Sequence, residues 1–246
     1  MISLAQHSES SIAVRPFHDL REMGACVGLQ QRVWNYAEID IVPEHIFVLA
    51  AIAGGQVLGA FDGETAVGFS LALPAIRDKH LHLHSHMVAV LPEYENRGIG
   101  RKIKIAQRDD ALAREFDLIE WTFDPMQIRN AHFNITTLGT IVRRYLPDLY
   151  GQTSSPLHGN LPTDRLVAEW WIGRGIHSKP DASTEPERVS LPLDIGEICR
   201  DEPQRAVAIQ SELRQRFQQS FACGHAAAGF EMTSDHASYL MRPYEN

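Results

Sequence analysis

The sequence predicts an α/β protein, and three observations carry this prediction. Short alternating segments rich in β-branched and aromatic residues recur between longer segments with helical spacing. The turn Gly63-Glu64-Thr65 separates two alternating segments and predicts a β-hairpin. A third alternating segment, at 84–90, leads through Pro92 and the glycine turn at 98–100 into a basic helix.

In the first half of the chain, each element follows from a local signal. Pro43 suits the first turn of a helix and Gly54-Gly55 closes that helix, while Asp124-Pro125 ends a strand. Residues 1–10 are polar and are expected to be flexible. The order predicted here is strand 11–17, helices 20–34 and 43–53, strands 57–62, 66–73 and 84–90, helix 98–115 and strand 118–123.

The second half is predicted from weaker patterns. Gly139 closes a helix, and a loop rich in Gly, Pro and Ser fills 151–163. The polar, proline-containing stretch 174–188 is expected to be a linker, which separates a core of 11–173 from a C-terminal appendage at 189–246. The predicted elements are helix 126–138, strands 140–151, 165–172 and 188–193, helix 201–221 and strand 228–241.

Composition and charge exclude several classes of protein. The 246 residues are 44% apolar and 22% charged, which is ordinary for a globular chain. A net charge of −8 argues against broad binding to nucleic acid or to anionic membranes. We expect a cytoplasmic location, because the sequence shows neither a leader pattern nor a membrane-length apolar run. Cys26, Cys199 and Cys223 lie far apart, so neither a disulfide framework nor a zinc ribbon is indicated.

The glycine turn at 98–100 has the features of a phosphate site. A turn that opens a helix leaves backbone N–H groups unpaired beside the positive end of the helix dipole. Cationic side chains surround the turn: Arg97, Arg101, Lys102 and Lys104. The alternative is an ordinary connection between strand and helix with a solvated basic face.

The segment from Val90-Leu91-Pro92 through Glu95-Asn96-Arg97-Gly98-Ile99-Gly100 resembles motif A of the GNAT superfamily of acyl-CoA-dependent N-acyltransferases. The resemblance implies a mixed, mostly antiparallel sheet flanked by helices and splayed between strands four and five. It also implies a cosubstrate, acetyl-CoA or another acyl-CoA, and no metal. The expected pyrophosphate contacts are Asn96, Arg97, Gly98, Ile99, Gly100 and Arg101, and Glu95 departs from the family's Gln or Arg. The strand backbone at Val88, Ala89 and Val90 is expected to orient the thioester oxygen.

Four histidines at alternate positions, His80, His82, His84 and His86, would share one face of a regular strand. A metal site and simple solvated or packed histidines are two readings of this row. His80 and His82 are expected to lie in the connection before the strand. The GNAT resemblance implies a third reading, in which His84 or His86 is the general base for the amine.

Between residues 130 and 150, the chain matches the family's motif less well. Many GNAT proteins carry a tyrosine that protonates the departing thiolate, and its position here is Ile135. The amides of Asn130 and Asn134 remain on this helix as cofactor contacts, and Tyr145 or Tyr150 is either a substitute hydroxyl or a packing aromatic.

Two residues are expected to contact the acceptor. Asp124 is either a helix N-cap or a polar group at the mouth of the active site. Arg165 is either a clamp for a substrate carboxylate or a structural neighbour of Asp164. The motifs WTFDP, NAHFN and PTDRL resemble those of one GNAT subgroup, some of whose members are thought to acylate amino acids, a few with succinyl groups.

The function predicted from the sequence is therefore transfer of an acyl group, acetyl or succinyl, from acyl-CoA to a primary amine of a small molecule by direct attack. The alternative is a GNAT-like sensor or assembly module that binds acyl-CoA without turnover. We expect a small-molecule partner rather than a nucleic acid or a membrane, and a homodimer is left open. The C-terminal appendage is expected to pack on the core or on a partner subunit.

Overall fold

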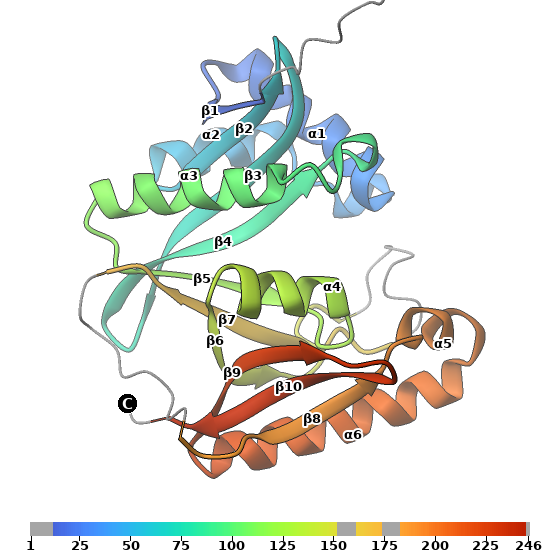
Figure 1. Cartoon of the computed structure of the whole chain (residues 1–246). Coiled ribbons are helices and arrows are strands. Elements are labelled where there is room, and N and C mark those ends of the chain that lie inside the picture. The colour runs from blue at the N-terminus through green and yellow to red at the C-terminus, as the bar shows by residue number, and fades with distance from the viewer. Residues whose placement is uncertain (1–11, 152–160, 174–182, 245–246) are drawn as a thin grey trace, which may run out of the picture. The chain divides into compact units, whose positions relative to one another are not determined.

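The computed structural model describes residues 12–151, 161–173 and 183–244 (Figure 1). The predicted flexible segment 1–10 and most of the predicted linker lie outside these residues. The chain divides into two compact units, Met1–Glu115 and Phe116–Asn246, which are described separately below.

The first unit contains a four-stranded antiparallel arrangement in the order β1-β2-β3-β4. Its strands are β1 (Ala13–Pro16), β2 (Gln56–Asp62), β3 (Thr65–Arg77) and β4 (His80–Val90). The predicted hairpin is confirmed, because Asp62 pairs with Thr65 across a turn in which Gly63 has a φ of 60°. Glycine suits this turn because it has no Cβ to penalise positive φ.

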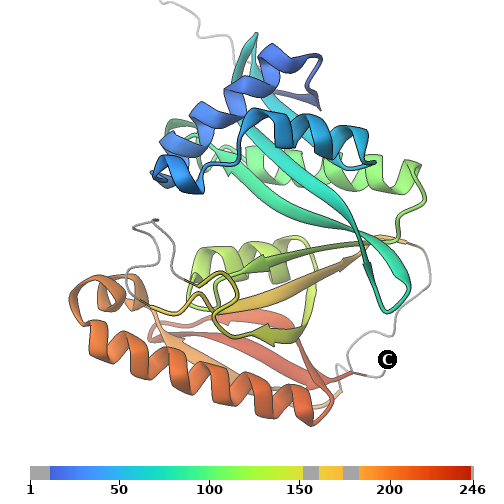
Figure 2. The ribbon, with the colours of Figure 1, turned by 180° about the vertical axis from the view of Figure 1, so that it is seen from behind.

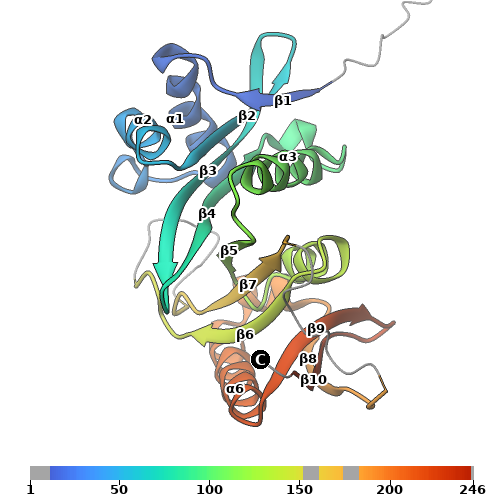
Figure 3. The ribbon, with the colours of Figure 1, turned by 90° about the vertical axis from the view of Figure 1, so that its left-hand side faces the viewer.

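Helices cover both faces of these strands, as Figures 2 and 3 show. One face carries α1 (Leu20–Trp34), the 3₁₀ turn η1 (Glu38–Asp40) and α2 (Glu44–Ile52), and the other face carries α3 (Ile99–Ala113). Phe69 of β3 packs edge-on against Trp34 and Phe47, with ring centroids 6.1 and 5.6 Å apart. This aromatic cluster identifies the sheet face that meets α1 and α2.

The buried stripe of α3 is partly polar. Leu112 is 42% exposed, and the helix ends at Ala113, short of the predicted end at 115. The buried positions recur about every four residues: Ile99, Ile103, Lys104, Gln107 and Ala111. Two polar residues therefore lie in the stripe that faces the sheet.

The second unit has the strand order β5-β7-β6-β9-β10-β8. The strands are β5 (Leu118–Phe123), β6 (Ile141–Leu146), β7 (Arg165–Trp171), β8 (Glu187–Pro192), β9 (His225–Met232) and β10 (His236–Pro243). Two predicted strands were wrong. Strand 140–151 ends at Leu146, because Pro147 has no N–H for the ladder.

The predicted single strand 228–241 is instead the hairpin β9–β10. Its turn is held by Thr233, whose Oγ1 accepts hydrogen bonds from the backbone N–H groups of Asp235 and His236 at 3.3 and 3.2 Å. Such local side-chain bonds favour turns over extended structure.

The helices of the second unit are α4 (Ile128–Ala131), α5 (Ile195–Asp201) and α6 (Pro203–Ala222). The predicted α-helix 126–138 is wrong in part, since α4 continues as a π-helix, η3 (His132–Thr137). Helix α5 was not predicted, and Glu202 separates it from α6, which begins at Pro203. In Figure 2, α6 lies across β8.

The C-terminal residues pack into the same unit as β5–β7. Val142 of β6 pairs with Ala227 of β9, and the hydroxyl of the buried Tyr239 donates to the Pro125 carbonyl at 2.7 Å. Phe217 of α6 lies between the rings of Tyr145 and Tyr239, 5.8 and 5.0 Å from their centroids. Within the described residues, every helix lacks the length or the apolar character needed to cross a membrane.

Candidate functional site

The connection from β4 to α3 is an exposed loop with two left-handed residues. The strand ends at Val90, the 3₁₀ turn η2 (Pro92–Tyr94) follows, and the Glu95 N–H donates to the Pro92 carbonyl at 3.1 Å. Asn96 and Gly98 have φ values of 60° and 73°. Among the described residues, no side chain caps α3 at Gly98. The N–H groups of its first turn therefore lack both a side-chain cap and an intrahelical partner, and they lie beside the positive end of the helix dipole.

The two glycines of this loop, Gly98 and Gly100, differ in backbone conformation. Gly98 adopts the left-handed conformation, which most side chains penalise. Gly100 has ordinary helical backbone, and a Cβ added there would meet no described atom within 4 Å. Nothing in the described part of the protein therefore excludes a side chain at Gly100, and the space beside it is open. An open cradle of N–H groups is the geometry that a phosphate group requires.

Three cationic residues, Arg97, Arg101 and Lys102, are exposed around this loop, and the Arg97 guanidinium lies 4.9 Å from the Tyr94 ring centroid. The prediction that Lys104 is a fourth cation at the turn was wrong. Lys104 is 3% exposed and turns toward the sheet, where its Nζ donates to Gln107 Oε1 at 2.6 Å and to Ser85 Oγ at 3.3 Å. Burial holds the pKa of Lys104 well below its usual value, and its side chain lies inside the protein rather than at the turn.

A β-bulge separates the two candidate base histidines. Met87 pairs with Leu71 and Ser85 with Ala72, so β4 contains one extra residue at His86. His84 pairs with Leu73, which shares a face with Leu71 and Phe69, and this is the face of α1 and α2. The expectation of one continuous histidine face is therefore wrong at His86.

The histidines also differ in burial. His80 and His82 lie inside β4 rather than in a connection, which corrects the prediction, and His82 is buried. The His86 side chain reaches solvent, yet the protein packed around it lowers its pKa below the usual value. Within the described residues, no group of three or more His, Cys, Asp or Glu side chains is arranged to hold a metal ion.

In the second unit, Asp124 and Arg165 lie close enough for their charges to interact. Asp124 follows β5, and its Oδ1 accepts from the Met126 N–H at 2.8 Å. Burial raises the pKa of the Asp124 carboxyl, while the Met126 N–H and the Arg165 charge oppose this shift. Arg165 is 7% exposed, and its Nη1 donates to the Asp164 carbonyl at 2.8 Å.

The two tyrosines that could substitute for the family acid have different surroundings. The Tyr145 hydroxyl donates to Asp164 Oδ2 at 2.5 Å, and burial followed by this bond raises the pKa of Tyr145. Tyr150 is 45% exposed, and its hydroxyl lies 2.9 Å from Thr122 Oγ1. The Arg165 guanidinium is 5.4 Å from the Tyr150 ring centroid.

The α4–η3 segment holds the other predicted cofactor contacts. Asn130 is exposed, whereas Asn134 is buried and its Oδ1 accepts from Trp121 Nε1 at 3.2 Å. Ile135, at the family's tyrosine position, is 3% exposed. A π-helix adds a residue to the turn, so its side chains do not follow the α-helical spacing by which the family motif is counted.

Comparison with known proteins agrees with this architecture. Residues 20–133 match the family model described as "Acetyltransferase (GNAT) family". This region is a GNAT acetyltransferase domain. The GNAT fold is confirmed by solved structures, and the fold class predicted from the sequence is therefore correct. No functionally curated protein matches the chain.

The similar solved structures resemble this chain in fold rather than in sequence. A GNAT-family protein from Desulfovibrio desulfuricans has 12% identity and a TM-score of 0.53, covering 66% of this chain and all of its own. A ribosomal-protein alanine N-acetyltransferase from Escherichia coli has 13% identity and a TM-score of 0.53, with coverage of 68% and 100%. The yncA protein from Salmonella typhimurium, solved with its cofactor acetyl-CoA, has 16% identity and a TM-score of 0.52, with coverage of 70% and 99%.

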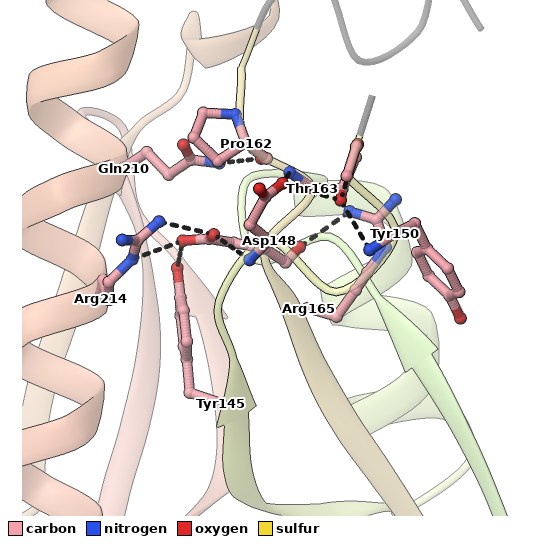
Figure 4. A network of polar contacts seen from close by, with 10 residues as sticks. Tyr145, Asp148, Tyr150, Pro162, Thr163, Arg165, Gln210 and Arg214 are labelled. Carbon is pink, nitrogen blue, oxygen red and sulfur yellow. Dashed lines mark hydrogen bonds and ion pairs between the residues drawn. The ribbon is translucent and has the colours of Figure 1, made fainter. Parts of the chain in front are cut away.

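Sequence reasoning missed a further cluster around Asp164. The Asp164 carboxylate binds Tyr145, the Asp148 N–H and Arg214 (Figure 4). Arg214 is 50 residues away on α6. The sequence shows no local pattern that links the two.

Proposed function

We propose that this GNAT protein is an N-acyltransferase that moves an acyl group from acyl-CoA to the primary amine of a small molecule, of the amino-acid class. The observation that carries the proposal is the open, uncapped N-terminus of α3 behind Gly98 and Gly100, which sits in a domain of the acetyltransferase family. The reaction forms a bond between the amine nitrogen and the acyl carbon and breaks the bond from that carbon to sulfur. The amine loses a proton and the thiolate takes one.

The donor is held by the loop before α3. Acyl-CoA supplies the activated thioester, and its pyrophosphate is bound by the N–H groups from Asn96 to Arg101. Exposed Arg97, Arg101 and Lys102 add positive charge there. The strand backbone from Val88 to Val90 orients the thioester oxygen, and the amides of Asn130 and Asn134 are further proposed contacts.

Proton removal from the amine is assigned to a histidine of β4. His86 is the stronger candidate, because its lowered pKa keeps the ring neutral and ready to accept a proton at pH 7. The bulge also places His86 outside the regular pairing of the strand, where a side chain can be aimed independently of its neighbours. His84 is the second candidate.

Recognition of the acceptor is assigned to Asp124 and Arg165. A guanidinium offers a planar fork that matches a carboxylate, and the nearby Asp124 carboxylate suits an ammonium group. The two groups together match the two charges of an amino acid. Recognition of a succinyl carboxylate on the donor is the other use of Arg165.

A second candidate function is acyl-CoA binding without turnover, as a sensor or assembly module. One observation favours it: Ile135 stands buried at the family's acid position, and the Tyr145 hydroxyl is engaged with Asp164. Under this alternative, acyl-CoA binds at the same loop but no amine releases free thiol.

Thiol release separates the two functions. Purified protein is incubated with acetyl-CoA or succinyl-CoA and each member of a panel of L-amino acids, their C-terminal amides, and short peptides, and free thiol is measured with a thiol reagent. The proposal expects release with at least one amino acid and at least tenfold slower release with the corresponding amide. Equal rates for an amino acid and its amide would contradict carboxylate recognition. Release with peptides alone would place the acceptor in the protein class.

A further inference from the structure

The C-terminal helix α6 contacts the segment that carries Arg165 at two points (Figure 4). Gln210 Nε2 donates to the Pro162 carbonyl at 2.8 Å, and Arg214 donates to the Asp164 carboxylate through Nε at 2.9 Å and Nη2 at 2.7 Å. Gln210 and Arg214 are four residues apart and therefore share one face of the helix. This face of α6 lies against residues 162–164.

The Asp164 carboxylate is the centre of the contact. Its side chain is fully buried, and it accepts from Arg214, from the Tyr145 hydroxyl at 2.5 Å and from the Asp148 N–H at 2.9 Å. Four hydrogen bonds on one buried carboxylate hold it in one orientation, because each lost bond would leave a buried charge poorly solvated. The carboxylate in turn raises the pKa of Arg214, which stays charged.

Thr163, just before β7, is bonded to residues that follow β6. Thr163 N–H donates to Asp148 Oδ1 at 3.0 Å, and Thr163 Oγ1 accepts from the Tyr150 N–H at 2.9 Å. These bonds join the residues after β6 to the residues before β7, so the position of one segment fixes the other.

Arg165 is the next residue after this locked segment. Its Nη1 donates to the backbone carbonyl of Asp164, whose carboxylate Arg214 holds, and its guanidinium lies beside the Tyr150 ring. A shift of the Asp164 peptide would therefore move the Arg165 guanidinium with it. A displacement on the order of 1 Å is enough to impair a bidentate contact with a carboxylate.

We infer that Arg214 is a positioning residue for the acceptor site: through Asp164 it sets the place of the Arg165 guanidinium, so the C-terminal helix is part of the apparatus that recognises the acceptor carboxylate. This inference rests on the proposed role of Arg165 in the transferase reaction. It assigns α6, which begins at residue 203, a functional task in addition to packing.

Steady-state kinetics of Arg214→Lys test the inference. Lysine keeps the charge but cannot make two parallel bonds to Asp164. With acetyl-CoA and the L-amino acid that the wild type uses best, the acceptor KM is expected to rise at least fivefold, while the acetyl-CoA KM and kcat stay within twofold. Gln210→Met, which removes only the bond to Pro162, is expected to raise the acceptor KM by a smaller factor.

Arg205→Lys is the matched control, because Arg205 lies on the same helix, is exposed and forms a local ion pair with Glu202 at 2.9 Å. It should leave every constant unchanged. In an Arg165→Lys background, Arg214→Lys should add less than twofold, since the two residues act through one contact. An unchanged acceptor KM in a folded Arg214→Lys variant, equal rises in both KM values, or full additivity with Arg165→Lys would each overturn the inference.

A second readout does not depend on turnover. The Arg165 Nε–H signal in a ¹H–¹⁵N spectrum, assigned by its loss in Arg165→Lys, should shift or broaden in Arg214→Lys and stay unchanged in Arg205→Lys. If the wild type acylates no amine, the proposed function fails, and this spectrum still decides the positioning role. An Arg165 signal identical in all folded variants would refute it.

Discussion

Replacing Gly100 by glutamate should remove coenzyme A binding while the fold persists. A Cβ at Gly100 meets no described atom within 4 Å, and the position has ordinary helical backbone, so the protein itself accommodates the new side chain. Glycine is also a poor helix former, so Gly100→Glu should keep or raise stability, by about 0.5–1 kcal/mol. The substitution changes only the space where the phosphates are proposed to lie.

The magnitude follows from the charge introduced. A carboxylate about 4 Å from a phosphate oxygen repels it by roughly 1 kcal/mol at the dielectric constant of water and by roughly 4 kcal/mol at an effective value of 20. The pyrophosphate carries more than one charge, and the side chain also blocks the N–H groups of the helix start. A loss of about 3 kcal/mol, or about 100-fold in affinity, is the expected minimum.

Isothermal titration calorimetry with coenzyme A measures this loss. The matched control is Gly28→Glu, because Gly28 is an exposed glycine inside α1 where an added Cβ would also meet no described atom within 4 Å. Both variants gain one negative charge in a helix, and only Gly100→Glu should lose binding. Unchanged affinity in a folded Gly100→Glu variant, or an equal loss in Gly28→Glu, would refute the placement of the cofactor.

Other changes to the protein and its conditions have expected outcomes. His86→Gln should lower kcat by roughly 10² to 10⁴ fold with little change in coenzyme A affinity, and His84→Gln should do so instead if His84 is the base, as single-turnover rates would show. Because the pKa of His86 lies below its usual value, kcat/KM of the wild type should rise with pH and reach its midpoint below about pH 6.5, and a midpoint above that value would contradict the assignment. Arg165→Lys should raise the acceptor KM at least tenfold, a loss of about 1.4 kcal/mol in binding free energy, and leave the acyl-CoA KM nearly unchanged. Equal kinetics for wild type and variant with every donor and acceptor would remove Arg165 from the site. Hydrogen bonds from Arg15 lower the pKa of Glu22 to about 2, so the stability that this pair contributes should be present above about pH 4.5 and disappear as the pH falls toward 2. The urea unfolding midpoints of wild type and Arg15→Met should therefore converge at low pH. A constant difference between the two midpoints would contradict the coupling.

Elements with complete local signals were predicted closely. Helix α1 has the predicted bounds, because Asp19 caps its first turn, with Oδ1 accepting from the Glu22 N–H at 2.9 Å, and Asn35 ends it in the left-handed conformation. Strand β5 also has the predicted bounds, since an apolar run precedes the stop at Asp124-Pro125.

The errors arose where tertiary contacts override the local pattern. Lys104 was assigned to the basic surface because lysine is usually exposed, but its position in the buried stripe of α3 and its bonds to Ser85 and Gln107 place it inside. The bulge at His86 depends on the register between β3 and β4, which strict alternation along one strand does not contain.

The local part of the candidate site was predicted in structure. The loop from Asn96 to Gly100 leads into a helix without a side-chain cap, as the contiguous motif predicted, and its binding of coenzyme A stays a prediction. The contact between Arg214 and Asp164 joins segments 50 residues apart, and a single sequence holds no signal for that pairing. The structure shows Arg165 as a neighbour of Asp164, to whose carbonyl its Nη1 donates. Its role as a clamp for a substrate carboxylate stays a prediction.

Detection of the acylated product tests the central claim most directly. Purified protein is incubated with acetyl-CoA and a mixture of L-amino acids, and the products are separated and identified by mass spectrometry alongside the free thiol. We predict an N-acetylated amino acid in a one-to-one ratio to coenzyme A released, and loss of both products in Gly100→Glu but not in Gly28→Glu. Acetyl-CoA binding with no acylated amine from amino acids, amides or peptides, using either acetyl-CoA or succinyl-CoA, would contradict the claim that this protein is a transferase.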